Sequence, residues 1–180
     1  MSEAARQGDG LSHTARTGSA REQFHDYAAV IATPWPAVKL GIVVRGETVT
    51  SIDFLPGDAA PHKARDALSR HVLRQLQAYF RNPQHHFSVP LAPAGTPFQR
   101  RVWDALQRIP SGTTLSYGEL ARRLGSSARA IGGACRANPI PVIIPCHRVV
   151  AAHGIGGFMG VTNGRGLHLK QSLLDHESFS

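Results

Sequence analysis

The chain has 180 residues, of which 42% are hydrophobic and 18% charged, a composition typical of a globular protein and unlike collagen, a coiled coil or a disordered chain. No apolar run reaches the roughly 18 residues that a membrane-spanning helix needs, and we expect no secretory segment and no membrane partner. The two cysteines exclude a disulfide scaffold and a cysteine-based zinc site. We therefore expect a cytoplasmic protein without a metal.

Charge is the first indication of a partner. There are 20 Lys and Arg against 12 Asp and Glu, a formal charge of +8 at pH 7. Residues 96–180 hold ten basic and four acidic residues, whereas residues 1–95 hold ten and eight. Such a surplus favours a polyanion such as nucleic acid, with solubility alone as the alternative. The C-terminal half is the candidate binding half.

The N-terminal half predicts a tail and a small α/β unit. Residues 1–24 carry almost no large apolar side chain, so we expect a flexible tail. Apolar residues at helical spacing predict a helix over residues 64–80, and residues 81–95 are expected to connect the two halves. Three segments rich in Val and Ile and separated by turn signals predict an antiparallel sheet: residues 27–33, 38–44 and 48–54.

Capping boxes mark two helix starts in the C-terminal half. Thr96-Pro97-Phe98-Gln99 opens a helix that continues to Ile109, and Ser116-Tyr117-Gly118-Glu119 opens one that Gly125 closes. A third helix over residues 128–137 begins at a Ser126 or Ser127 cap.

The second and third of these helices form a helix-turn-helix pattern, for which a plain helical hairpin is the alternative. The Gly-rich residues 154–166 lack the spacing of a nucleotide-binding loop and are expected to be flexible. The predicted fold class is α+β. It comprises a small N-terminal α/β domain with an antiparallel sheet over residues 25–93 and a helical C-terminal domain containing the helix-turn-helix over residues 94–180.

The segment Pro145-Cys146-His147-Arg148 places an imidazole directly after a thiol. A free thiol with a pKa of about 8.5 is mostly protonated at pH 7, and a nearby base raises its thiolate fraction. Neighbouring side chains on an extended segment point to opposite faces, so His147 reaches Cys146 only at a turn or through a water. A buried structural cysteine is the alternative interpretation.

This segment, together with Asn138-Pro139 and the helices around Tyr117 and Arg129, resembles the O6-alkylguanine-DNA alkyltransferase family over about residues 96–177. The resemblance implies transfer of the alkyl group from O6-alkylguanine in double-stranded DNA to Cys146, with O4-alkylthymine as an additional candidate substrate. It further implies a monomer that needs no cofactor, restores the base and is consumed by the reaction. A non-catalytic protein that binds alkylated DNA is the alternative, and the presence of Cys146 argues against it.

The resemblance also implies the roles of individual catalytic residues. Cys146 is the nucleophile, and His147 takes its proton through a water while Glu177 orients the imidazole. Tyr117 donates a proton or hydrogen bond to the departing guanine. The residues expected to hold the active site in place are Asn138, Pro145 and Arg148.

For DNA binding, the resemblance implies that the target base is flipped out of the stack and that a recognition helix enters the minor groove. Arg129 is expected to fill the space that the nucleotide leaves, with a phosphate contact as the alternative. The other residues expected to contact DNA are Ser116, Ala130, Gly132 and Arg136.

The sequence departs from the family pattern at two places. Residues 157–167 are longer than usual and offer no recognisable pocket serine, and Ser172 stands where many members have tryptophan. These changes predict a larger or looser pocket. Cys135 is interpreted as a packing residue, with a second reactive thiol as the alternative.

Overall fold

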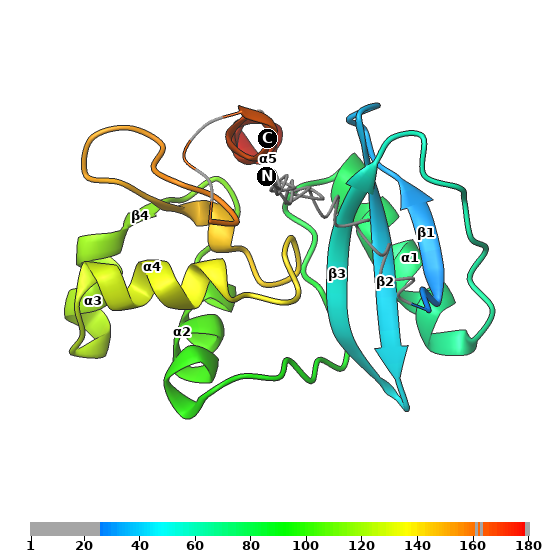
Figure 1. Ribbon diagram of the computed structural model, residues 1–180, viewed down its shortest axis with the longest axis horizontal. Helices are drawn as coiled ribbons and strands as arrows, with labels where there is room; N and C mark the ends of the chain where they lie inside the picture. The colour runs from blue at the N-terminus through cyan, green and yellow to red at the C-terminus, as the bar shows by residue number, and fades with distance from the viewer. Residues whose placement is uncertain (1–25, 161, 163, 179–180) are drawn as a thin grey trace, which may run out of the picture.

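The computed structural model describes residues 26–160, 162 and 164–178, so the tail predicted for residues 1–24 lies outside the described residues. The three-stranded sheet and α1 lie on one side of the molecule, and α2, α3 and α4 lie on the other (Figure 1). This arrangement has the predicted α+β class. The helix-turn-helix pattern lies in the helical half.

The sheet is antiparallel, as predicted, and its strands lie in the order β1-β2-β3. Leu40 and Ile42 lie two residues apart in the second strand, and Ile42 is paired with Ile52 of the third, so these three buried side chains share one face of the sheet. Gly46 adopts a φ of 58° in the turn between the second and third strands. The strands are β1 (Ala29–Ala32), β2 (Val38–Arg45) and β3 (Thr48–Pro56).

Helix α1 (Ala67–Arg81) begins three residues later than predicted. Asp66 is its cap: the carboxylate accepts a hydrogen bond from the backbone N–H of Ser69 at 2.7 Å, and the Ser69 hydroxyl accepts one from the Asp66 N–H at 3.3 Å. This reciprocal cap fixes the start of the helix and leaves Ala64 outside it. The helix buries Ser69, Val72, Leu76 and Tyr79.

The helices of the other half are α2 (Pro97–Gln107), α3 (Tyr117–Leu124) and α4 (Ala128–Arg136). Both predicted capping boxes are present, at Thr96 with Gln99 and at Ser116 with Glu119, and Ser127 caps α4. Gly125 ends α3 with a φ of 60°. Helix α2 ends at Gln107, so Ile109 packs from the following turn rather than from the helix.

Three further elements complete the fold: the parallel pair β4 (Leu115–Ser116) and β5 (Val149–Val150), the 3-10 helix η1 (Cys146–Arg148) and the last helix α5 (Gly164–Ser178). The prediction of a loop through residue 166 was wrong at its end, because α5 already begins at Gly164. The two-residue strands are too short to leave a periodic pattern in the sequence.

The sheet and the helical half share one continuous buried core. A backbone hydrogen bond also joins them, because the N–H of Ile52 in β3 donates to the carbonyl of Pro139 at 2.9 Å. Pro139 follows directly on Asn138, so the sheet contacts the segment that leads into Cys146 and His147.

Candidate active site

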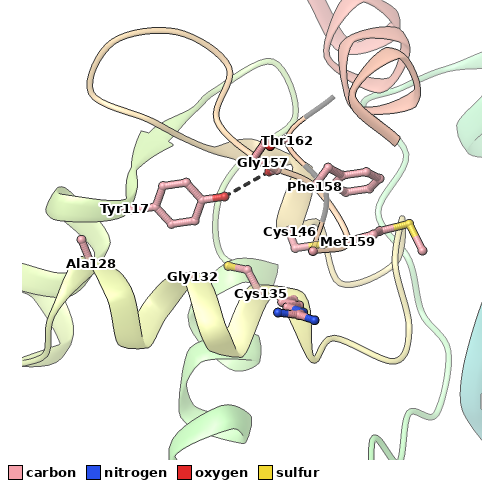
Figure 2. Close-up of a pocket in the computed structure, with 11 residues that line it drawn as sticks. Tyr117, Ala128, Gly132, Cys135, Cys146, Gly157, Phe158, Met159 and Thr162 are labelled. Carbon is pink, nitrogen blue, oxygen red and sulfur yellow. Dashed lines mark hydrogen bonds between the residues drawn. The ribbon is translucent and has the colours of Figure 1, made fainter. Parts of the chain in front are cut away.

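Cys146 is the first residue of η1 and is 5% exposed, at a cavity of about 340 Å³. Figure 2 shows its side chain and that of Cys135 within this cavity, beneath the loop that carries Phe158 and Met159. Neighbouring side chains of an extended segment would point to opposite faces, but Cys146 and His147 lie in a 3-10 turn. The chain turns at Cys146, so the thiol lines the cavity while His147 is fully buried behind it.

Asn138 braces the turn before the cysteine. Its Nδ2 donates to the carbonyl of Ile144 at 2.8 Å, and its Oδ1 accepts from the N–H of Ile140 at 3.0 Å. Between these two contacts Val142 adopts a φ of 72°, which is unfavourable for a β-branched residue. The Asn138 amide therefore holds a strained turn in place.

The pKa of the Cys146 thiol is raised by its burial, although a hydrogen bond with Asn138 and the charge of Lys170 act in the opposite direction. Burial together with the neighbouring Cys146 raises the pKa of Cys135 to about 12. Both thiols are therefore protonated in the resting protein at neutral pH, and reaction at Cys146 needs a base.

His147, the next residue in the chain, is buried and is held in one orientation. Its Nε2 lies 2.9 Å from Oε1 of Glu177, while its Nδ1 is buried without a hydrogen-bond partner among the described residues. Burial lowers the pKa of His147, and Glu177 acts against this to a smaller extent. The imidazole is thus neutral. Its proton lies on Nε2, which donates a hydrogen bond to Glu177, so Nδ1 keeps a free lone pair.

Glu177 is 2% exposed and is surrounded by hydrogen-bond donors. Besides His147, Arg148 donates through Nε to Oε2 at 2.9 Å and through Nη2 to Oε1 at 2.8 Å. The hydroxyl of Tyr79 donates to Oε1 at 2.8 Å, and the N–H of Gly112 donates to Oε2 at 3.4 Å. Burial acts to raise the pKa of Glu177, but its hydrogen bonds with His147 and Arg148 and the charge of Arg148 hold that pKa well below its usual range. The carboxylate stays ionised.

Tyr117 and Lys170 meet at one carbonyl on the wall of the cavity. The Tyr117 hydroxyl donates to the carbonyl of Gly157 at 3.2 Å, and Lys170 Nζ donates to it at 3.0 Å (Figure 2 shows the tyrosine contact). Lys170 also donates to the carbonyl of Val149 at 2.6 Å. Burial raises the pKa of Tyr117 to about 12 and lowers that of Lys170 to about 8. The tyrosine hydroxyl therefore remains a proton donor at neutral pH.

One face of α4 lines the cavity, through Ala128, Gly132 and Arg136 at intervals of four residues. Arg129 is exposed and does not line the cavity. The small side chains on this face leave room for a ligand beside Cys146. The volume falls within the range of about 300–1,000 Å³ common for ligand sites.

Comparison with known proteins agrees with this geometry. Residues 97–179 match the family described as "6-O-methylguanine DNA methyltransferase, DNA binding domain". A methylated-DNA–protein-cysteine methyltransferase of Haemophilus influenzae is 39% identical over 153 residues, which are 80% of this chain and 83% of that protein. The chain belongs to the methylated-DNA–protein-cysteine methyltransferase family. A further member, from Methanosarcina acetivorans, is 46% identical over 60% of this chain and 68% of its own length.

Solved structures of the methyltransferase family share the fold. The O6-methylguanine methyltransferase of Mycobacterium tuberculosis superimposes with a TM-score of 0.69 at 35% identity, covering 83% of this chain and 91% of that one. The same coverages hold for the M. tuberculosis OGT in complex with DNA, which has a TM-score of 0.67 at 37% identity.

The structure brings most of the predicted methyltransferase residues together. Cys146, Tyr117 and two of the predicted DNA contacts, Gly132 and Arg136, line the cavity, and His147 meets Glu177 behind it. The Ser116 hydroxyl is engaged in the α3 cap, where it donates to Glu119 at 2.7 Å, and Ala130 is half-buried on α4. Arg129 as a base-replacing side chain stays a prediction.

Sequence reasoning missed two residues of this site. Tyr79 reaches Glu177 from α1, and Lys170 reaches the cavity wall from α5. Lys170 is fully buried, and a lysine inside an amphipathic helix gives no sign in the sequence that its ammonium points inward. Among the described residues, no group of three or more His, Cys, Asp or Glu is placed to hold a metal ion, and no helix is long and apolar enough to cross a membrane.

Proposed function

We propose that the protein repairs O6-alkylguanine in double-stranded DNA by moving the alkyl group onto Sγ of Cys146, once per molecule and without a cofactor. Three features support this proposal: a buried thiol at a cavity of about 340 Å³, a neutral histidine next to it in sequence, and membership of the methyltransferase family. O4-alkylthymine is an additional candidate substrate.

The reaction is an in-line displacement at the alkyl carbon. A bond forms between Sγ of Cys146 and that carbon while the bond from carbon to guanine O6 breaks. The thiol proton passes through a water to Nδ1 of His147, whose positive charge the ionised Glu177 stabilises. The guanine anion takes up a proton from water, and the Tyr117 hydroxyl turns from the Gly157 carbonyl to donate a hydrogen bond to it. Protonated His147 returns its proton to water, so the net change moves the alkyl group to sulfur and a proton to the base.

DNA has to present the base outside the duplex, because O6 of a stacked guanine lies out of reach of a thiol that is 5% exposed. In this proposal α4 enters the minor groove and the exposed Arg129 occupies the space of the flipped nucleotide. The exposed face of small residues on α4 suits a close approach of its backbone to DNA. The protein acts as a monomer in the cytoplasm.

The observation that carries the mechanism is that Nδ1 of His147 has no hydrogen-bond partner in the part of the chain that the structure describes. A buried ring nitrogen without a hydrogen bond is costly, and here it belongs to the residue that follows a protonated thiol. A role of Nδ1 as the acceptor of the thiol proton explains why this nitrogen is left without a hydrogen bond.

The test is the intact mass of the protein after incubation with an excess of duplex that contains O6-methylguanine. A single increment of one methylene, about 14 Da, in the Cys146 peptide is expected because a thioether forms once. Cys146→Ser should bind the duplex and show no increment. An unchanged mass of the wild-type protein despite tight binding would instead identify a lesion-binding protein.

A further inference from the structure

A second concentration of positive charge lies outside the proposed active site, on and just before α1. Residues 63–81 contain five basic residues and one acidic residue. The acidic one, Asp66, is engaged in the helix cap with Ser69. Helix α1 itself has no Asp or Glu over its 15 residues. The near balance of charge over residues 1–95 conceals this local excess.

Three of these arginines share one face. Arg70, Arg74 and Arg81 are exposed, and together with the exposed Gln77 they recur at intervals of four, three and four residues, the spacing of one helix face. The opposite face packs against the core through Val72, Leu76 and Tyr79. We call the surface formed by Arg70, Arg74, Gln77 and Arg81 the α1 basic face.

The arginine side chains of the α1 basic face have no ion-pair partner among the described residues. Within that part of the chain, the ion pair of an arginine is that of Arg148 with Glu177, far from this face in sequence. The Arg70 guanidinium donates to the carbonyl of Arg65, and the side chains of Arg74 and Arg81 have no hydrogen bond to another described residue. Their guanidinium groups are free to contact another molecule.

The N-terminal part of this arrangement opposes helix stability. Arg70 and Arg74 are like charges four residues apart, a spacing that destabilises a helix. Lys63 and Arg65 directly precede the helix N-terminus, where the helix dipole disfavours cations, whereas it favours Arg81 in the last turn. Solubility alone would be provided equally well by a mixture of acidic and basic residues. Positive charge that is kept although it lowers helix stability therefore points to a polyanionic partner.

The α1 basic face is separate from the proposed recognition helix. Figure 1 shows α1 beside the sheet, with α3 and α4 in the opposite half of the molecule. From Arg70 to Arg81 the helix runs on the order of 16 Å. Duplex DNA carries a charge about every 1.7 Å of its axis, so this length passes several phosphates.

We infer that the α1 basic face is a second DNA-binding site, which holds the phosphate backbone of a duplex segment other than the one at α4. This inference rests on the proposed function, since it takes DNA as the polyanion. Arginine contacts to phosphates give affinity without base sequence, so the site binds unmodified DNA. It retains the protein on neighbouring DNA while α4 probes for a lesion.

The experiment is native mass spectrometry of limiting protein with excess short duplex containing O6-methylguanine. We expect wild-type protein to appear with one and with two duplexes, and Arg70→Gln, Arg74→Gln, Arg81→Gln together to abolish the two-duplex species. The matched control is Arg45→Gln, which removes an exposed cation at the end of β2 and should keep both species. Across a salt series, the logarithm of the second binding constant should fall with the logarithm of the salt concentration. The slope should be near −2.7, the value for about three phosphate contacts.

Two outcomes overturn the inference: a wild-type protein that never exceeds one duplex, or a triple variant that still binds two. The proposed function is tested separately in the same spectra, because methyl transfer adds mass to the protein. The triple variant should gain that mass as fast as the wild type on short duplex. Failure of methyl transfer with a retained second binding step would refute the proposed function alone.

Discussion

The hydroxyl of Tyr79 donates a hydrogen bond to Oε1 of Glu177 at 2.8 Å, although the two residues lie 98 positions apart. The same oxygen accepts from Nε2 of His147 at 2.9 Å. Tyr79 of α1 and the proposed catalytic histidine therefore donate to the same carboxylate oxygen. Burial raises the pKa of Tyr79 far above its usual value, so its hydroxyl always donates.

Tyr79→Phe tests this contact. Loss of one donor to a buried carboxylate is expected to reduce the free energy of unfolding by about 1–3 kcal/mol, measured by urea denaturation. Glu177 then becomes a stronger acceptor for His147, so the pKa of His147 rises and the acid limb of the transfer rate moves to higher pH. Tyr27→Phe, which removes the hydroxyl bonded to Asp53 at 3.1 Å, should leave that limb in place. A stability loss without a displaced limb would mean that Tyr79 only packs.

His147→Gln should slow methyl transfer at neutral pH by roughly 10²–10⁴-fold, because the thiol loses its base. The loss should shrink as pH rises, since the Cys146 thiol, with its raised pKa, then ionises without help. The measurement is the single-turnover rate against pH for both proteins. In the wild type the rate should fall only below about pH 6.5, because the pKa of His147 is lowered. An equal loss at every pH would contradict the role of base.

Glu177→Gln is expected to destabilise the fold by about 3–5 kcal/mol, because Arg148 is left buried without its counter-charge. The carboxylate has a lowered pKa in the folded state, so its stabilisation is complete above the unfolded pKa of about 4.3 and is lost as pH falls through the folded pKa. Urea denaturation between neutral and acid pH should show this loss in the wild type. The same acid-dependent loss in the variant would assign it to other groups.

Arg129→Ala should slow the repair of duplex DNA far more than the reaction with a free-base analogue of O6-alkylguanine. The arginine is exposed on α4 and outside the cavity, so it is placed to act on the DNA and not on the bound base. Single-turnover rates on the two substrates give the comparison, with Arg45→Ala as the control for loss of a surface charge. Equal slowing on both substrates would contradict a role in base extrusion.

Local signals in the sequence predicted the helices more accurately than the contacts between them. The boxes at Thr96 with Gln99 and at Ser116 with Glu119 mark the starts of α2 and α3 to the residue. The box at Asp66 was missed because its partner is Ser69 instead of Glu or Gln. Such caps depend on residues three positions apart, which a sequence displays directly.

The candidate site was predictable where a short motif holds it. Cys146, His147 and the brace Asn138 lie within ten residues, and the resemblance to a family assigned Glu177. The contact of Tyr79 with Glu177 and the inward ammonium of Lys170 depend on how α1 and α5 pack. No local pattern encodes that packing, because each helix shows only its own periodicity.

The hydrogen bond from the Ile52 amide to the carbonyl of Pro139 gives access to the dynamics of the active-site turn. Ile52 is 2% exposed, so its amide proton exchanges with solvent only when this contact opens. Opening separates β3 from the backbone next to Asn138, which braces the turn before Cys146. The hydrogen-exchange rate of one amide in the sheet therefore reports how often the sheet loses its contact with the segment that leads into the proposed nucleophile.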